Sequence, residues 1–278
     1  MTRVAAVLVT SNSARWLEPT LTSVLAQEQL PDEIVIIDDR SIDDTLSIIE
    51  RVAGSRVRVI PAGATATDLS TRIAANFRQG LQEVRHCDVA ILGDHDDIWR
   101  PDRVAHQTQA LQVWSDVTLL ASDGRLIDLF GNVVPGSLRT AFPVPQDFND
   151  FSPSQQMRAV IRRSVATGGA SAVRPATFAD VAIPAGWLHD RWWSLVATAR
   201  EQKRLDDDTV IDYRISPGQE VGLDRGHQAR STLDRLRTGV GQLGITTSRI
   251  RDLHSLAVTA TAKTAPELRG ARLLRNLV

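Results

Sequence analysis

Alternating strand and helix patterns dominate the first 130 residues and constrain the fold more than any other feature. Short runs of aliphatic and β-branched residues lie at 3–10, 33–39, 56–62 and 88–94, each followed by a segment with helical spacing. Such continuous apolar runs are typical of strands buried on both faces of a sheet. A further strand is predicted at 117–122. This order predicts an α/β domain with a mostly parallel sheet flanked by helices.

Acidic side chains follow two of these predicted strands. Asp38 and Asp39 end the second strand, and the sequence Asp-His-Asp-Asp at 94–97 ends the fourth. In such folds ligands bind beyond the carboxyl ends of the strands, so both clusters are expected to border one crevice. Mg²⁺ or Mn²⁺ prefers carboxylate oxygens and leaves coordination positions for substrate phosphates. The alternative is that these acids form turns and caps; two clusters at one sheet edge favour a metal.

A second group of candidate residues lies between 168 and 193. Asp190 is surrounded by aromatic residues in the run WLHDRWW, which could stack on sugar rings and raise the pKa of the carboxyl group. The alternative, which we favour for Trp193, is that Trp192 and Trp193 begin a buried helix. The small residues GGASA at 168–172 suit either a close approach of the backbone to a ligand or tight sheet packing.

The charge distribution is uneven although the net charge is only −1. Residues 225–278 contain ten basic and three acidic residues, which leaves a charge of −8 on residues 1–224. A basic helical segment of this kind predicts packing against the acidic body, which we favour, or contact with anionic lipid headgroups through Arg269, Arg272 and Arg275. The same helix could instead pair with a second copy and give a homodimer.

Composition excludes several classes of protein. The single cysteine, Cys87, is inconsistent with an internal disulfide framework. The apolar run at the N-terminus is too short for a signal peptide or a membrane span. We therefore expect a cytoplasmic protein, at most peripheral at the inner face of the cell membrane, and nothing in the sequence predicts nucleic-acid binding.

Three fragments in this order and spacing, VLVTSN, DEIVIIDDRSIDDT and ILGDHDDIWRPDRV, resemble the inverting family-2 glycosyltransferases with a GT-A fold. The form DHDDIWRPD, together with Asn76-Phe77 and HDRWW at 189–193, is closest to the bacterial rhamnosyltransferase-like branch. The resemblance covers residues 3–120 and reappears at 165–215.

The resemblance also implies a domain organisation. Residues 1–224 would form the GT-A (Rossmann-like) domain, with a nucleotide-binding half at 1–125 and an acceptor-binding half at 126–224. Residues 225–278 would form a basic helical C-terminal extension. Within the acceptor half, residues 131–153 lack a periodic pattern and are predicted to form a loop or lid.

Roles for the nucleotide and the metal follow residue by residue from the resemblance. Thr10 and Asn12 match the positions that hold the base and ribose, and Asp39 matches the acid that accepts a hydrogen bond from the pyrimidine ring. Asp94 and Asp96 match the DXD pair. Asp96 is expected to bind Mg²⁺ or Mn²⁺ directly, and Asp94 to reach the ribose or a metal-bound water.

Roles on the acceptor side follow in the same way. Asp190 is implied as the general base that removes the proton from the acceptor hydroxyl. Trp187, His189 and Trp192 would line the pocket for the acceptor and the sugar. Asn76, in the helix after the third strand, is implied as a nucleotide-binding residue.

Two departures from the family pattern bear on catalysis. Ser216 occupies the position where this branch usually has a histidine, two residues after the arginine of DYR, and serine cannot replace imidazole as a ligand. Ala75 stands where many relatives carry a basic residue before the asparagine. Both departures predict weaker metal binding, or a diphosphate held partly by Arg214 or Arg225.

The expected function is transfer of a sugar from dTDP-rhamnose or a UDP-hexose to a hydroxyl of a cell-surface glycan or a lipid-linked acceptor, with inversion. The alternative is a catalytically weak or inactive GT-A domain that binds sugar nucleotide and acts as an interaction module. A nucleotidyltransferase is disfavoured because the segment VTSNSARW after the first strand contains no glycine.

Overall fold

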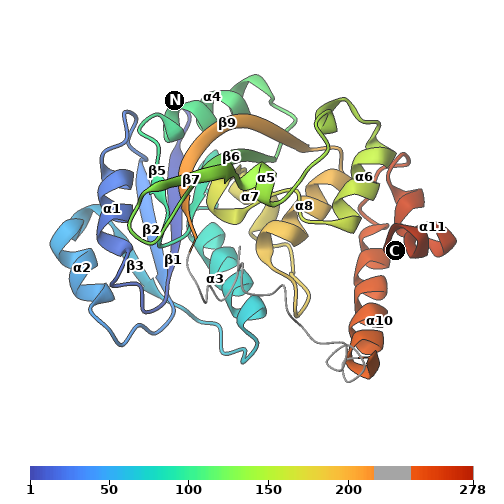
Figure 1. Ribbon diagram of the computed structural model, residues 1–278, viewed down its shortest axis with the longest axis horizontal. Coiled ribbons are helices and arrows are strands. Elements are labelled where there is room, and N and C mark those ends of the chain that lie inside the picture. The colour runs from blue at the N-terminus through green and yellow to red at the C-terminus, as the bar shows by residue number, and fades with distance from the viewer. Residues whose placement is uncertain (216–238, 278) are drawn as a thin grey trace.

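A computed structural model of the chain describes residues 1–215 and 239–277 (Figure 1). The described residues form one sheet in the order β3-β2-β1-β4-β8-β6-β9-β5, with β7 paired to β6 outside this path. The strands are β1 Val4–Thr10, β2 Glu33–Asp38, β3 Arg58–Pro61, β4 Val89–Gly93, β5 Ile98–Trp99, β6 Leu119–Ile127, β7 Val133–Ser137, β8 Ser171–Val173 and β9 Lys203–Arg214.

The sheet confirms the predicted α/β class but is more mixed than the alternating pattern predicted. β1 pairs in parallel with β2 and β4, and β2 with β3, as expected for the first half of the chain. β8 then lies antiparallel between β4 and β6, and β5 lies antiparallel to β9. β8 has only three residues and directly follows the tight turn at Gly168–Ala170, so it lacks the long apolar run that predicted the parallel strands.

Helices cover both faces of this sheet (Figure 1). The α-helices are α1 Leu17–Leu25, α2 Thr45–Val52, α3 Leu69–Glu83, α4 Arg103–Val113, α5 Leu138–Ala141, α6 Pro153–Arg162, α7 Pro175–Phe178, α8 His189–Ala199, α10 Gly239–Leu256 and α11 Gly270–Leu277. Short 3₁₀ turns lie at Gly54–Arg56, Phe148–Asp150, Gly168–Ala170 and Ala265–Leu268.

The core divides into two clusters, one on each face, because successive side chains of a strand point in opposite directions. On β1, Val7 belongs to the cluster that includes Phe77 of α3 and Trp193 of α8. Its neighbour Leu8 belongs to the cluster that includes Leu17 of α1. β1 and β4 are therefore buried at every position, and their continuous apolar runs are the pattern that predicted them.

Residues 131–153 differ from the predicted loop or lid. β7 and α5 occupy much of this stretch, and β7 forms an antiparallel hairpin with β6. The pattern was missed because β7 is an exposed edge strand with the sequence VVPGS, and edge strands tolerate the Pro and Gly that usually mark loops.

The C-terminal segment packs on the body of the protein. Leu253 and Leu256 of α10 and Leu273 of α11 belong to the same core cluster as α3 and α8. Lys263 forms an ion pair with Glu201 at 3.0 Å. These contacts agree with the packing alternative. In the part of the chain that the structure describes, no helix is both long and apolar enough to span a bilayer.

Candidate active site

Asp38, at the end of β2, stabilises the loops that follow β1 and β2. Its carboxylate accepts hydrogen bonds from Thr10 Oγ1 at 2.9 Å and from Ser41 Oγ at 2.6 Å. Asn12 has a positive φ of 47° and is exposed, and its Oδ1 accepts a hydrogen bond from the backbone N–H of Ile42 at 2.9 Å. Thr10 and Asn12 thus tie the loops after β1 and β2 together, and their contact with a nucleotide stays a prediction.

Asp39 forms an ion pair with Arg72, a residue that was not predicted to belong to the site. Arg72 of α3 donates from Nε to Asp39 Oδ2 at 2.5 Å, and Asp39 is buried. One turn further along α3, Asn76 is fully buried, and both polar atoms of its side chain lack a hydrogen-bond partner among the described residues. Unpaired buried amides are costly, and the predicted contact of Asn76 with the nucleotide stays a prediction.

The acids after β4 gather around the turn that precedes β8. A methyl group added to Gly169 would lie 2.6 Å from Asp94 Oδ2 and 2.8 Å from Asp97 Oδ2, so both carboxylates press against this glycine. Asp97 accepts a hydrogen bond from the backbone N–H of Arg214 at 3.1 Å. Its other oxygen is buried and has no hydrogen-bond partner among the described residues. Gly169 is therefore required for these carboxylates to lie so close to the backbone.

Burial, and then charge repulsion, raises the pKa values of the carboxyl groups in this cluster. Burial, then the neighbouring charges of Asp96 and Asp190, raises the pKa of Asp94 to about 7. Burial and the charges of Asp96 and Asp94 raise the pKa of Asp97 well above its usual value. The structure thus brings Asp94, Asp96, Asp97 and Asp190 into one electrostatic cluster, although the sequence separates Asp190 from the others by more than ninety residues.

Arg103 of α4 is a buried cation next to these acids. It donates from Nη2 to the backbone oxygen of Leu92 at 2.7 Å, and its guanidinium stacks on Trp99 with 4.1 Å between the guanidinium carbon and the ring centroid. Burial lowers the pKa of Arg103 to about 9, and the charges of Asp97 and Asp94 act in the opposite direction. Arg103 thus supplies part of the positive charge that the acidic cluster requires.

Asp190 lies in the first turn of α8 and faces the same glycine-rich turn. Its carboxylate accepts hydrogen bonds from the backbone N–H of Gly168 at 3.3 Å and of Arg191 at 2.5 Å. Burial raises the pKa of Asp190 to about 6, although these two hydrogen bonds act to lower it. A carboxylate with this pKa is well suited to accept a proton near neutral pH.

The aromatic residues around Asp190 are packed into the core. His189 stacks on Phe77 with 3.8 Å between ring centroids, and burial lowers the pKa of His189 to about 3, so its imidazole is neutral. Trp187 donates from Nε1 to Asp252 of α10 at 3.0 Å and contacts Trp192 with 5.2 Å between centroids. All three residues are at least 96% buried. Their predicted contact with an acceptor or sugar is not tested by these packing contacts.

Two residues that the sequence analysis singled out lie in the part of the chain that the structure does not describe. Two arginines near the acidic residues were not predicted. Ser216 and Arg225 lie outside the described residues. The sequence did not predict that Arg72 and Arg103 would contact the site, because an arginine on a helix is most often a surface residue.

Other metal-donor groups among the described residues are already compensated. Two sets of three side chains have donor atoms within 4.8 Å of one another: Glu33, His86 and Cys87, and His106, Asp206 and Asp208. Glu33 also pairs with Arg3 at 2.7 Å, and His106 lies 2.8 Å from Asp206. The crevice acids are not such a close set, so a cation there would take one or two of their oxygens and complete its shell with water and phosphate.

Comparison with known proteins places this arrangement in a family. The sequence model described as Glycosyl transferase family 2 matches residues 5–167. The succinoglycan biosynthesis protein ExoO of Rhizobium meliloti (strain 1021) is 30% identical over 46% of this chain and 36% of its own length. The dTDP-rhamnosyl transferase RfbG of Shigella flexneri is 28% identical over 37% of this chain and 36% of its own length. The matches thus span about a third of these relatives.

Solved structures agree on the fold. TarS of S. aureus (residues 1–349, in complex with UDP) superposes with a TM-score of 0.60 at 14% identity, covering 99% of this chain and 71% of that one. The mannosyltransferase PcManGT from Pyrobaculum calidifontis, in complex with GDP-Man and Mn²⁺, gives a TM-score of 0.54 at 16% identity, covering 98% and 69%. These similarities identify the α/β sheet as a GT-A fold. The chain belongs to glycosyl transferase family 2.

Proposed function

We propose that this protein transfers a sugar from a nucleoside diphosphate to an acceptor hydroxyl, with inversion at the anomeric carbon. The observation that carries the proposal is the cluster of Asp94, Asp96 and Asp97 with Asp190 across the turn at Gly168–Ala170. It combines a group of carboxylates suited to a cation with a separate carboxylate suited to proton transfer. TarS was solved with UDP and PcManGT with GDP-Man and Mn²⁺, and both support a sugar-nucleotide donor here.

The residues present suit a hard divalent cation. The donors are all carboxylate oxygens, and Asp97 Oδ2 is buried without a partner among the described residues. Asp96 and Asp94 would hold the ion, which when bound would neutralise the charge that develops on the leaving diphosphate. Thr10, Asn12, Asp39 and Asn76 would bind the nucleoside part of the donor.

The chain's own residues account for the acceptor side of the reaction. Asp190 is oriented by the backbone N–H groups of Gly168 and Arg191. In its deprotonated form it would take the proton from the acceptor hydroxyl as that oxygen attacks the anomeric carbon. Neutral His189 packs against Gly168 and keeps the turn in place. The donor would be dTDP-rhamnose or a UDP-hexose, and the acceptor a surface glycan or a lipid-linked precursor at the membrane.

The Asp96→Ala variant tests this assignment. Transfer or donor hydrolysis should fall to background with each sugar nucleotide that the wild-type protein uses, because the carboxylate expected to bind the metal directly is lost. Asp116→Ala, which removes a carboxylate outside the crevice, serves as the control and should keep wild-type turnover. Undiminished turnover of Asp96→Ala would refute the metal assignment.

A calorimetric experiment separates an enzyme from an inactive binding module. The module alternative predicts that the wild-type protein binds UDP or dTDP but turns over none of the donors with any acceptor. The proposed transferase predicts binding and turnover together.

Metal affinity should depend on pH. Because the pKa of Asp94 is raised to about 7, a proton competes with the cation below that pH, and the apparent Mn²⁺ affinity should fall by about tenfold per pH unit well below it. The measurement is calorimetric titration of Mn²⁺ in the presence of UDP or dTDP at pH values above and below 7. An affinity that does not change with pH would contradict a role for Asp94 at the metal.

A further inference from the structure

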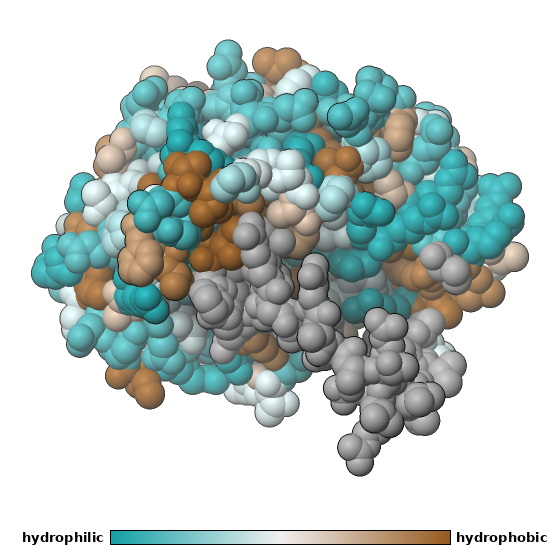
Figure 2. Space-filling model, viewed as in Figure 1, coloured by the Kyte–Doolittle hydropathy of each residue, from teal (hydrophilic) through white to brown (hydrophobic). Residues whose placement is uncertain are grey.

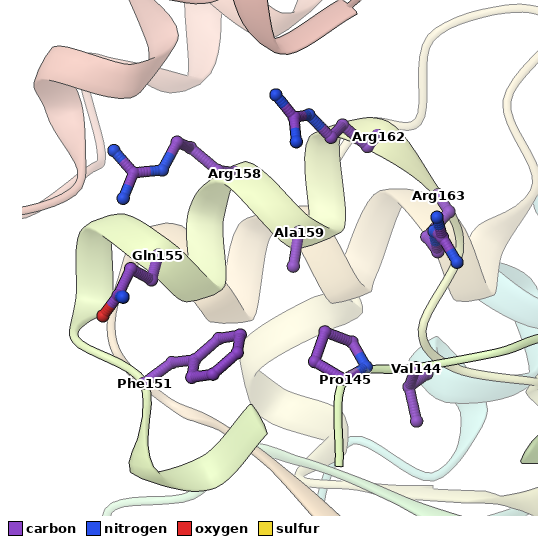
Figure 3. Close-up of a pocket in the computed structure, with 8 residues that line it drawn as sticks. All are labelled: Val144, Pro145, Phe151, Gln155, Arg158, Ala159, Arg162 and Arg163. Carbon is purple, nitrogen blue, oxygen red and sulfur yellow. The ribbon is translucent and has the colours of Figure 1, made fainter. Parts of the chain in front are cut away.

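A groove lined by arginines lies on α6, in the second half of the chain. It has a volume of about 410 Å³ and lies between α6 and the segment that precedes it (Figure 3). Its lining residues are Val144, Pro145, Phe151, Gln155, Arg158, Ala159, Arg162 and Arg163. The groove is therefore lined by apolar residues and by three arginines, and by no acidic residue. This combination matches an amphiphile that has an anionic head and an apolar body.

An ion-pair cluster links the arginines of α6 to the C-terminal helix α11. Arg158 of α6 and Arg272 of α11 both approach Glu267 Oε1, at 3.6 Å and 3.5 Å. Glu267 is 2% exposed and also accepts a hydrogen bond from Ser154 at 2.6 Å. This buried carboxylate therefore holds α6 and α11 together. In Figure 3, Arg158 and Arg162 extend from the same side of α6.

Glu267 pairs with two of the arginines on this surface and leaves others without an acidic partner among the described residues. Arg162 is exposed, and its side chain forms no hydrogen bond or ion pair with any described residue. On α11, Arg275 is exposed and contacts only the backbone oxygen of Ala271, at 3.4 Å. Leu274, beside it, is 53% exposed. Figure 2 shows the region of α6 and α11 as mostly hydrophilic, with a smaller hydrophobic area.

We propose that α6 and α11 form one docking face for an anionic phospholipid bilayer, with the α6 groove receiving a lipid headgroup and its adjoining apolar part. Charge complementarity carries the proposal: exposed arginines with unused hydrogen-bonding capacity border an apolar groove and lie next to an exposed leucine. Arginine donates to phosphate oxygens in a bidentate manner, and basic residues near an anionic leaflet each add to binding. The inference rests on the proposed function only in that a lipid-linked acceptor would require such a location.

Vesicle co-sedimentation of the full chain, without sugar nucleotide, tests the proposal. The protein should bind vesicles that contain phosphatidylglycerol, should not bind phosphatidylcholine alone, and should be released by salt. Arg162→Glu and Arg275→Glu should each lower the partition coefficient by at least about fivefold, and the double variant by at least about 30-fold.

Arg56→Glu/Arg100→Glu is the matched control. Both residues are exposed and form no ion pair within the described residues, and Arg56, like Arg275, donates to the backbone oxygen four residues earlier, here that of Val52 at 3.2 Å. This variant carries the same change in net charge and should bind vesicles like the wild type. Equal losses in both double variants would show attraction by net charge alone and overturn the assigned face.

Three further results would also overturn the proposal. A loss with Arg275→Glu but not with Arg162→Glu would exclude the groove. Vesicle binding that does not depend on phosphatidylglycerol would exclude the anionic bilayer. Binding of inorganic phosphate to the protein, without any binding of vesicles, would exclude it as well. Because these assays need no turnover, vesicle binding without transfer would reject the proposed function and leave the docking face standing.

Discussion

Replacing Asp190 with Asn should lower kcat by about 10²–10⁴-fold, the contribution that a positioned general base usually makes. Asparagine keeps the shape of the side chain and one oxygen that can accept the hydrogen bond from Gly168, but it cannot take a proton. Donor binding should change little, because Asp190 lies at the first turn of α8 and not among the predicted nucleotide contacts. The measurement is kcat and KM for transfer together with calorimetric binding of the nucleoside diphosphate.

The pH profile provides a second readout of the same residue. Burial raises the pKa of Asp190 to about 6, and only the deprotonated form can act as a base. The rate at saturating metal should therefore rise as the pH increases through about 6 and level off above it, and this limb should disappear in Asp190→Asn. Asp180→Asn, a change at an exposed carboxylate that pairs with Arg85, is the control. Wild-type kcat in Asp190→Asn would show that another group is the base.

Gly169→Ala is expected to lower both the stability and the turnover of the protein. Its methyl group would lie 2.6 Å from Asp94 Oδ2 and 2.8 Å from Asp97 Oδ2, distances that require one of the carboxylates to move. Because the oxygen of Asp97 that would be displaced is buried, overpacking of about 1–3 kcal/mol is expected. Displacement of the proposed metal ligand should reduce turnover by about 10²-fold, as small misplacements in an active site do.

Gly63→Ala is the matched control, since a methyl group there would meet only Gln79 Oε1 at 3.6 Å, an ordinary contact. The free energy of unfolding, the Mn²⁺ affinity and kcat should be measured for both variants. If Gly169→Ala bound Mn²⁺ and turned over like the wild type, the turn would not be holding the carboxylates in place.

The first half of the fold could be predicted from sequence because β1, β2 and β4 are apolar at nearly every position and segments with helical spacing separate them. The acids at the ends of β2 and β4 were predicted at one sheet edge for the same reason. The approach of Asp190 to Asp94 was implied only by the family resemblance, since no local pattern encodes a contact between residues so far apart.

Other features of the site depend on tertiary contacts that the sequence does not show. Trp187 donates a hydrogen bond to Asp252 of α10, and no sequence pattern predicts this contact. Arg103 is fully buried, yet its place in α4 has the same spacing as any surface arginine. The run of small residues at 168–172 was noticed, but only the structure shows that Gly169 contacts two carboxylates and that Gly168 contacts His189.

The position of β8 has a consequence for how this protein is synthesised. β8 fills the place between β4 and β6 in the sheet, whereas the family match ends at residue 167, before β8 begins. A nascent chain that has emerged as far as β6 therefore lacks the strand that joins it to β4. Completion of the sheet depends on pairings between distant residues, which form slowly. The exposed edges of β4 and β6 should make ribosome-bound intermediates that end before residue 171 prone to aggregate.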